Sequence, residues 1–335
     1  MDVSLVHASL PPELKRYFQP EAMDPFYNEH VLTGLYGTNW YSVLISTERY
    51  AFLHTFSKKR IEGMNMFDVE PSLGYAGPLV NTNDADFTRT ALERYSELCR
   101  TENVIAELVR FNPLLENHRF FADAAAIDIS PAKEIVIARC HADEAPQLAE
   151  FSDACVRRVR RGARDCRYRE LDHPDEIHAF AALYRESLER LGAAANWYLE
   201  DGFFQRAAAL PPFRFHGVFA GSDLVSACLT AESGSTAYYL LAANCHPHAP
   251  GANEFLIYSI AHAGSRRRLQ NLVLGGGTTA ASDDPLLRFK RKFSKATHTL
   301  FIGKIVHDKG AFDALSSRQS PRPDLFLSYR TAAAP

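Results

Sequence analysis

Three consecutive glycines and a basic stretch that follows them form the most distinctive chemical pattern of this chain. Gly275, Gly276 and Gly277 end an apolar run, and Arg288-Phe289-Lys290-Arg291-Lys292-Phe293 lies shortly after them. Glycines at the end of a strand let a phosphate or another backbone approach closely. The pattern is neither a P-loop nor a GxGxxG fingerprint. Two interpretations stay open: a tight strand-to-helix turn with a solvated Lys290, or a binding loop beside a functional cation.

Arginines crowd into a second stretch in the middle of the chain. They are Arg157, Arg158, Arg160, Arg161, Arg164, Arg167 and Arg169. No acidic residue interrupts them before Asp165. Because arginine grips phosphate with two parallel hydrogen bonds, the stretch predicts a site for a phosphate-bearing molecule. The alternative is the solvated basic face of a helix.

A third stretch, Cys245–Asn253, lies between an expected strand and an expected helix. Its cysteine and two histidines could ligate a metal, but no second cluster of ligands accompanies them, and we expect no metal site. Free backbone N–H groups at a helix that begins near Gly251 can instead hold a pyrophosphate or a carboxylate. The alternative is an ordinary loop.

Two stretches of the first half are also of interest. Gly74–Leu79 predicts a turn that contains Tyr75, and the expected strand Asn103–Phe111 carries Glu107 and Arg110. Side chains three apart on a strand point to opposite faces, so one of this pair can enter a site or a salt bridge. GxSxG, HExxH and Ser/His/Asp patterns are absent, which leaves nucleophilic hydrolysis without support.

The composition is that of a folded globular protein. The 335 residues are 46% hydrophobic and 23% charged, which predicts about two domains with full cores. Lys and Arg total 37 against 40 Asp and Glu, so the net charge of -3 argues against a protein that coats nucleic acid non-specifically. Six cysteines without a CxxC pair indicate reduced thiols. Without an apolar run of 18 residues or a signal peptide, we expect a cytoplasmic protein with no membrane span.

Hydrophobic periodicity predicts an α/β pattern. Expected strands and hairpins cover Trp40–Phe56, Asn103–Phe111, Ala124–Ile129, Glu134–Ile137, Phe213–Ala220, Asp223–Ala231, Ser235–Ala243 and Leu269–Leu274. Expected helices cover Asp84–Arg100, Asp175–Leu191, Leu199–Ala208, Gly251–Ala263 and Asp283–Phe293. Ser282 or Asp283 suits the N-cap of the last helix, and Pro285 its first turn. Between Ser235 and Leu274 the expected order is a strand–helix–strand crossover.

Taken together, these stretches resemble the FemAB/FemX-type acyltransferases, which are tandem GNAT-like proteins. The resemblance rests on the order and spacing of short pieces: Tyr75–Pro78, Glu107–Leu114, Arg157–Ala163, Leu183–Leu191 with Tyr198, Asn253–Gly264, Leu274–Gly277 and Arg288–Phe293. It implies an α/β (α+β) fold with two GNAT-like domains around a central cleft. These domains would cover residues 1–150 and 151–310, and the segment 311–335 would return to the first.

The resemblance also implies an enzyme that joins an acyl group to an amine. The donor would be an aminoacyl-tRNA or an acyl-CoA, used as co-substrate and not as a permanently bound cofactor. The acceptor would be an amine of a cell-wall, sugar or natural-product precursor, and no DNA would be bound. CoA-dependent GNAT enzymes carry an (Arg/Gln)-x-x-Gly-x-(Gly/Ala) loop. Here His248–Asn253 stands in that place, and only Gly251 matches. A catalytically inactive GNAT-fold binding protein is the alternative.

For individual residues, the resemblance implies that Lys290 stabilises charge at the reacting carbonyl. Arg157, Arg158 and Arg161 match a basic helix that binds phosphate-bearing substrate. The remaining expected binding residues are Gly275, Gly276, Gly277, Gly251, Asn253 and Tyr75. Glu107 or Asp283 would accept the proton of the amine, although Asp283 suits helix capping better. A cation near the developing oxyanion suffices without a covalent intermediate on the enzyme.

Overall fold

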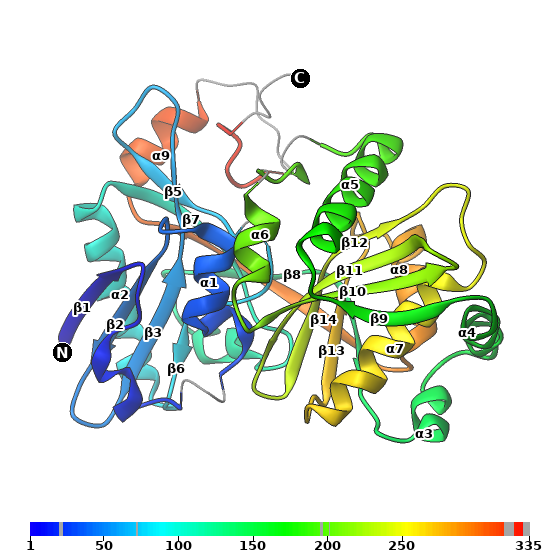
Figure 1. The fold of residues 1–335 in the computed structure, drawn as a ribbon. Coiled ribbons are helices and arrows are strands. Elements are labelled where there is room, and N and C mark those ends of the chain that lie inside the picture. Colours follow the sequence, from blue (N-terminus) through cyan, green and yellow to red (C-terminus); the bar gives the residue numbers. More distant parts are fainter. Residues whose placement is uncertain (20–22, 72, 195–196, 201, 318–324, 331–335) are drawn as a thin grey trace. The chain divides into compact units, whose positions relative to one another are not determined.

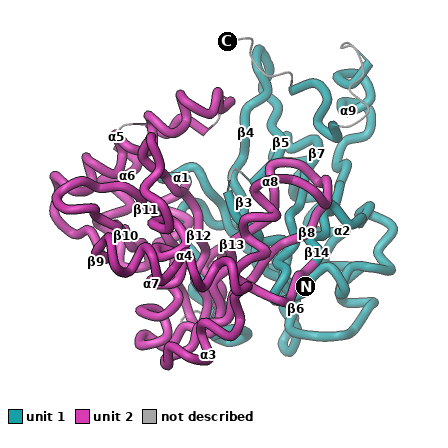
Figure 2. Tube along the Cα trace, turned by 90° about the vertical axis from the view of Figure 1, so that its right-hand side faces the viewer, with its two compact units in different colours: residues 1–20, 36–132, 299–335 teal, residues 21–35, 133–298 magenta. Residues whose placement is uncertain are grey.

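The chain folds into two compact units of mixed α and β structure (Figures 1 and 2). The computed structural model describes all residues except 20–22, 72, 195–196, 201, 318–324 and 331–335. Unit 1 comprises residues 1–20, 36–132 and 299–335, and unit 2 comprises residues 21–35 and 133–298. This division differs from the expected boundaries, because residues 21–35 and 133–150 lie in unit 2 and residues 299–310 lie in unit 1. No helix that the structure describes is both long and apolar enough to cross a membrane.

Unit 1 contains two groups of hydrogen-bonded strands. The first group is antiparallel and has the order β1 (Asp2–His7), β2 (Tyr41–Ser46), β3 (Ala51–Phe56) and β6 (Leu79–Val80). The second has the order β4 (Lys58–Arg60), β5 (Phe67–Val69), β7 (Val104–Arg110) and β14 (Thr297–Val306). Within it only β5 and β7 run parallel. The predicted hairpin Trp40–Phe56 is confirmed as β2 and β3.

Helices cover both faces of β7 in unit 1. Helix α2 (Ala85–Thr101), capped by the Asp84 carboxylate, buries Phe87, Ala91 and Tyr95 in the cluster that contains Val104. The next residue of β7, Ile105, points to the other face and packs with Leu315 of α9 (Lys309–Ser316). Short 3-10 turns at Pro12–Arg16 and Asn117–Phe121 complete the unit. Neighbouring residues of β7 therefore pack into two separate apolar clusters, one on each face of the strand.

Unit 2 is built on a second run of strands. Their order is β8 (Asp128–Arg139), β13 (Asn271–Gly275), β12 (Thr236–Asn244), β11 (Asp223–Ser233), β10 (Phe213–Ala220) and β9 (Arg167–Leu171). Only β12 and β13 are parallel, and α7 (Ala252–Arg266) connects them. This confirms the expected strand–helix–strand crossover. The chain enters unit 2 within β8 and leaves it near the start of β14.

Two helical layers sandwich these strands (Figure 1). Phe215 of β10 packs on Phe180 of α5 (Pro174–Leu191) and on Phe204 of α6 (Phe203–Ala208). Val218, three residues further along, faces the opposite cluster with α7 and α4 (Asp153–Asp165). The other helices of this unit are α1 (Glu29–Tyr36), α3 (Glu144–Ala149), α8 (Pro285–Lys290) and the 3-10 turns Pro25–Tyr27 and Arg291–Phe293.

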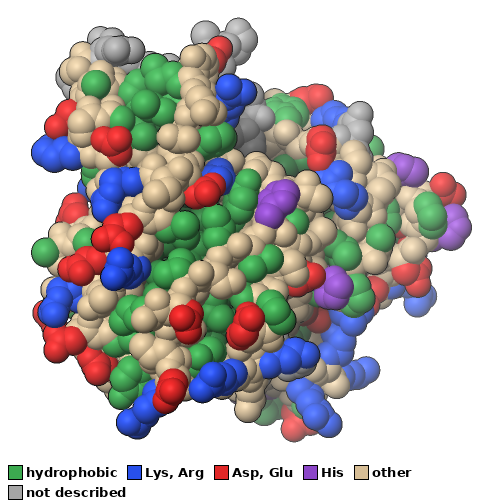
Figure 3. Space-filling model, turned by 90° about the vertical axis from the view of Figure 1, so that its left-hand side faces the viewer, with side chains coloured by type: hydrophobic (Ala, Val, Ile, Leu, Met, Phe, Trp, Pro, Cys, Tyr) green, Lys and Arg blue, Asp and Glu red, His purple; other side chains and the backbone are tan. Residues whose placement is uncertain are grey.

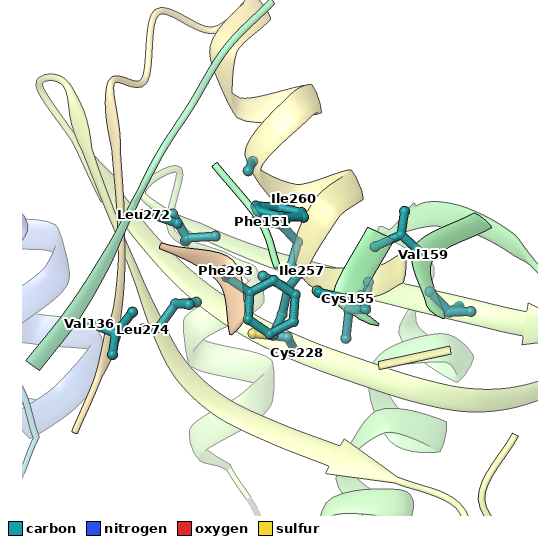
Figure 4. Close-up of a cluster of buried hydrophobic side chains, with 14 of the residues drawn as sticks. Val136, Phe151, Cys155, Val159, Cys228, Ile257, Ile260, Leu272, Leu274 and Phe293 are labelled. Carbon is teal, nitrogen blue, oxygen red and sulfur yellow. The ribbon is translucent and has the colours of Figure 1, made fainter. Parts of the chain in front are cut away.

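The cluster on the α4 and α7 side is the main core of unit 2 (Figure 4). Phe293 lies fully buried among Cys155, Cys228 and Ile257, and its ring meets that of Phe151 edge-on at 5.3 Å. Phe293 directly follows the basic stretch that carries Lys290. Burial of this aromatic side chain therefore anchors the end of that stretch to the core.

Four expected elements differ in their bounds. Of the strand expected at Ala124–Ile129 only the last two residues are in a strand, because β8 begins at Asp128, and residues 124–127 lie outside it. The strand expected at Glu134–Ile137 is part of the same β8, whose first half is exposed or half-buried and so lacks an apolar run. The helix expected from Leu199 begins at Phe203, after Gly202 as its N-cap. The helix expected from Asp283 begins at Pro285, because the carboxylate of Asp284 caps it.

Two glycines bring α4 and the start of α7 into backbone contact. A Cβ on Gly162 would lie 2.4 Å from the carbonyl oxygen of Gly251, and a Cβ on Gly251 would lie 2.3 Å from that of Arg158. Gly251 also has a φ of +85°, a left-handed conformation that side chains rarely adopt. This approach fixes the arginine-bearing helix against the loop that precedes α7.

We expect Gly162→Ala to lower the free energy of unfolding by roughly 1–3 kcal/mol, because the added methyl overpacks this contact. Alanine otherwise stabilises a helix relative to glycine. Urea-induced unfolding measures the change. Gly310→Ala on α9 is the matched control, since a Cβ there meets nothing closer than Asp308 at 3.5 Å. A Gly162→Ala variant as stable as this control would contradict the close contact.

Candidate functional site

Two ammonium groups hold the glycine loop of unit 2. Lys290, the last residue of α8, donates from Nζ to the carbonyl of Gly276 at 2.8 Å. Lys133 on β8 donates from Nζ to the carbonyl of Gly277 at 3.0 Å. Consecutive carbonyls that follow β13 are thus fixed by cations from two different elements. Lys290 and the three glycines, singled out in the sequence, lie together here.

The surroundings of Lys290 disfavour its charged form. Burial, and then the neighbouring charge of Lys133, lower the pKa of Lys290 to about 8. Asp284 and Cys228 act in the opposite direction and do not offset this. Within the described part of the chain, no carboxylate forms a salt bridge with Lys290. The ammonium is therefore held by a backbone carbonyl and is not neutralised by an acidic partner.

Asp284 shapes the other side of the loop. Its carboxylate accepts hydrogen bonds from the backbone N–H groups of Thr279, Leu286 and Leu287, and it also accepts one from the Thr279 hydroxyl. The bond from the Thr279 amide, followed by that from Leu287, holds the pKa of this carboxyl well below its usual range. The expectation that Ser282 or Asp283 caps α8 is therefore wrong. Asp284 has both the correct offset from Pro285 and the buried position.

An ion pair fastens the residue after Lys290 to β8. Arg291 donates from two guanidinium nitrogens to the two carboxylate oxygens of Glu134, each at 2.6 Å. The hydrogen bond from Arg291 lowers the pKa of Glu134. Because Glu134 follows Lys133 directly, adjacent residues of β8 contact the loop before α8 and the turn after it. Paired bonds of this kind also fix direction, which positions the end of α8.

The arginine helix presents its basic side chains to solvent. Arg157, Arg158, Arg160, Arg161 and Arg164 of α4 are all exposed. Arg161 has a 3.7 Å ion pair with Asp165, and in the described ranges no carboxylate pairs with the other four. On the face drawn in Figure 3, by contrast, acidic and basic side chains are intermixed. Since Gly251 contacts the backbone of Arg158, the predicted arginine and glycine positions lie side by side.

Asn253 connects this region with the interior. The hydroxyl of Tyr239 on β12 and Oδ1 of Asn253 lie 3.4 Å apart. Burial, and then the proximity of Cys228, raise the pKa of Tyr239 well above its usual value, so the phenol keeps its proton. Cys228 also acts on Lys290. Tyr239, which contacts Asn253, and Lys290 thus both have Cys228 as an electrostatic neighbour.

Tyr75 and Glu107 belong to unit 1. The carbonyl of Tyr75 accepts a hydrogen bond from the Asn112 side chain at 3.3 Å. The next residue, Ala76, donates from its backbone N–H to Arg110 and lies beside Phe111 as in a parallel ladder. The two stretches of the first half that the resemblance singled out are therefore neighbours.

Glu107 lies in a closed, buried network. His54 donates from Nε2 to Oε1 of Glu107 at 2.5 Å, and the Tyr95 hydroxyl donates to Oε2 at 2.7 Å. The Nε2 atom of His307 lies 3.7 Å from the same Oε2. Burial by itself raises the pKa of Glu107, but His54 and His307 outweigh it and hold the pKa well below its usual range. With 1% exposure, Glu107 has the surroundings of a structural anion, and its role as proton acceptor stays a prediction.

Sequence reasoning missed several residues that the structure brings together. Lys133 and Glu134 in unit 2 and the partners of Glu107 in unit 1 were not singled out. One signal was present for the first two, because a charged pair stands directly before the apolar run Ile135–Ala138. Among the residues that the structure describes, no group of three or more His, Cys, Asp or Glu side chains is arranged to hold a metal ion.

Comparison with known proteins identifies the fold. No family model matches the sequence, and no curated protein sequence matches it. A crystal structure of FemX matches with a TM-score of 0.66 and 11% identity, over 86% of this chain and 93% of that one. L-PGS from Bacillus licheniformis gives a TM-score of 0.61 and 10% identity over 97% and 98%. A tandem GNAT protein from the clavulanic acid biosynthesis pathway gives 0.53 and 12% over 91% and 99%.

The chain therefore has a fold similar to those of FemX and a tandem GNAT protein, and the fold class expected from the sequence is confirmed.

We expect Glu107→Gln to lower the free energy of unfolding at neutral pH by about 3–5 kcal/mol, because it removes one partner of a buried ionic network. A carboxyl whose pKa is depressed on folding stabilises the folded state above its unfolded pKa, about 4.3 for glutamate, and loses that effect as the pH falls below it. Denaturant unfolding at several pH values should therefore show a smaller acid sensitivity in this variant than in the parent.

Glu97→Gln is the control for this prediction, since Glu97 pairs with Arg94 on the exposed surface of α2. Its effect should stay within about 0.5 kcal/mol. Equal stabilities of the two variants would exclude the buried network as a determinant of unit 1.

Proposed function

We propose that this protein is an N-acyltransferase that forms an amide bond, with Lys290 at the reacting carbonyl. The acyl donor is an aminoacyl-tRNA or an acyl-CoA, and the acceptor is an amine of a cell-wall, sugar or natural-product precursor. The FemX-like fold supports the general class. The observation that carries the proposal is a half-buried ammonium beside a glycine loop, bound to a carbonyl and lacking a salt bridge among the described residues.

This arrangement suits the chemistry of amide formation. A neutral amine attacks the acyl carbonyl, the C–N bond forms, and the carbonyl oxygen becomes an oxyanion. The C–O bond of an aminoacyl ester, or the C–S bond of a thioester, then breaks, and the amine proton ends on the leaving group. A fixed cation in a poorly hydrated site stabilises the oxyanion strongly. Lys290 can do this without first breaking an ion pair.

A phosphate-bearing donor suits the exposed arginines of α4. Both an acyl-CoA and a tRNA carry phosphates, and arginine recognises this group with paired hydrogen bonds. Gly251, which has a left-handed backbone conformation, is the N-cap of α7 and lies beside α4. Backbone N–H groups at the start of a helix favour the binding of an anion. We therefore assign Arg157, Arg158, Arg161, Gly251 and Asn253 to donor binding.

We expect Lys290→Ala to reduce turnover roughly a hundred- to a thousandfold, the usual effect of removing one oxyanion donor. Because the pKa of Lys290 is lowered to about 8, the cation is present below that pH. Activity of the parent protein should therefore fall as the pH rises through about 8. Transfer to a panel of amines, followed by mass spectrometry, measures both effects.

Lys292→Ala controls for the loss of a nearby charge, since Lys292 pairs with Glu254 at 3.8 Å. Its turnover should remain within about twofold of the parent. Unchanged turnover in a folded Lys290→Ala variant would remove Lys290 from the mechanism.

Titration with acetyl-CoA, charged tRNA and uncharged tRNA distinguishes the donors. We expect the double variant Arg157→Ala, Arg161→Ala to bind the preferred donor at least about tenfold more weakly, with a smaller dependence on salt. The variant Arg89→Ala, Arg94→Ala removes the same charge from α2 and should bind as the parent does. If both variants bound the donor equally well, the arginines of α4 would be only the solvated face of a helix and not a donor site.

Saturable binding of acetyl-CoA would assign the donor as an acyl-CoA, and a preference for charged tRNA would assign it as an aminoacyl-tRNA. If neither molecule bound, the proposed transferase activity would give way to an inactive binding protein with this fold.

A further inference from the structure

Lys133 is the residue of the glycine loop that neither the motif nor the proposed reaction accounts for. Its aliphatic stem lies beside Gly276, where a Cβ would meet the carbonyl oxygen of Glu134 at 2.5 Å and then Cδ and Cε of Lys133 at 3.2 and 3.3 Å. Its ammonium then binds the carbonyl of Gly277. A side chain at position 276 would therefore clash with the backbone of β8 at Glu134 and crowd the Lys133 stem, so the glycine keeps the loop close to this part of β8.

The two lysines reach the loop from opposite ends of the sequence of unit 2. Lys133 comes from β8, and Lys290 from the end of α8, and they bind the carbonyls of adjacent residues. Glu134 and Arg291, the residues that follow each lysine, are joined by two hydrogen bonds. This second connection keeps the two backbones in register, so the ammonium groups stay neighbours.

We propose that Lys133 is a positioning residue for Lys290: it holds the glycine loop at Gly277 and keeps a second positive charge beside the ammonium of Lys290. This inference rests on the proposed function of Lys290. The like charge makes Lys290 easier to deprotonate, and the fixed carbonyl of Gly276 sets where its ammonium lies. Lys133 thereby adds to the effect of burial and narrows the pH range over which Lys290 is a cation.

The groups that face Lys290 come from four places. Lys133 lies on β8, Asp284 at the start of α8, Cys228 on β11, and the carbonyl of Gly276 in the loop. Asp284 favours the charged form, but four hydrogen bonds already occupy its carboxylate. Burial keeps the thiol of Cys228 protonated by raising its pKa. Lys133 is therefore the neighbouring side chain that opposes the charge on Lys290.

The test is the titration of Lys290 in the intact protein. Trace labelling with acetic anhydride at a series of pH values, read by mass spectrometry of the peptide that contains Lys290, reports the neutral amine. In Lys133→Gln we expect the midpoint to rise by about one pH unit, because the like charge is gone. In Lys133→Arg, which keeps the charge, the midpoint should stay that of the parent. Lys292→Gln, whose charge pairs with Glu254, should also leave it unchanged.

An unaltered midpoint in Lys133→Gln would overturn the proposal. If that variant failed to fold, Lys133→Met, which keeps an apolar stem over Gly276, would give the same reading. The pH profile of amide formation provides the second readout: its alkaline limb should move upward with the midpoint in Lys133→Gln. Should Lys290→Ala retain full turnover, the proposed function would fail, whereas the labelling midpoints would still decide whether Lys133 controls Lys290.

Discussion

A positive charge that is half-buried beside another positive charge is the constraint on which the glycine loop of unit 2 depends. Lys290 has no salt bridge among the described residues and donates to the carbonyl of Gly276, while Lys133 donates to the carbonyl of Gly277. The carbonyls must therefore face the ammonium groups, which requires the loop to turn sharply after β13. Gly275 makes this turn with a φ of +79°. The charge, the turn and the glycines are thus parts of one arrangement.

Glycines, which have no side chain, let the other parts of this region pack closely. At Gly277 a Cβ would lie 2.5 Å from the carboxylate of Asp284, which must reach back over the loop to cap α8. At Gly162 and Gly251 the same absence lets α4 approach the start of α7. The contact between Gly277 and Asp284 positions α8, which carries Lys290. The contact between Gly162 and Gly251 positions α4, which carries the exposed arginines. The positions of Lys290 and of the arginines on α4, to which we assign the function, therefore depend on glycines that leave space for these close contacts.

The two units treat a buried charge differently. In unit 1 the carboxylate of Glu107 is buried and accepts hydrogen bonds from His54 and Tyr95, with His307 close by. In unit 2 the ammonium of Lys290 has no salt bridge among the described residues, and burial lowers its pKa to about 8. Under the proposed function, the ammonium of Lys290 can bind a developing anion, whereas the carboxylate of Glu107 is already occupied by its protein partners. This contrast is why we assign the chemistry to Lys290.

The sequence by itself determined the local elements. In the hairpin Trp40–Phe56 and in helix α2, backbone hydrogen bonds join residues that are near each other in the sequence, and burial of one face leaves a periodic apolar pattern. It also singled out Lys290 and the glycine loop by their types and spacing. Only the tertiary structure decided that Lys133 holds that loop from 144 residues away. It likewise decided that Asp284 caps α8, that residues 299–310 belong to unit 1 and that residues 21–35 belong to unit 2. A periodic apolar pattern shows which face of an element is buried but not which distant element packs against it, so these contacts could not be predicted from the sequence.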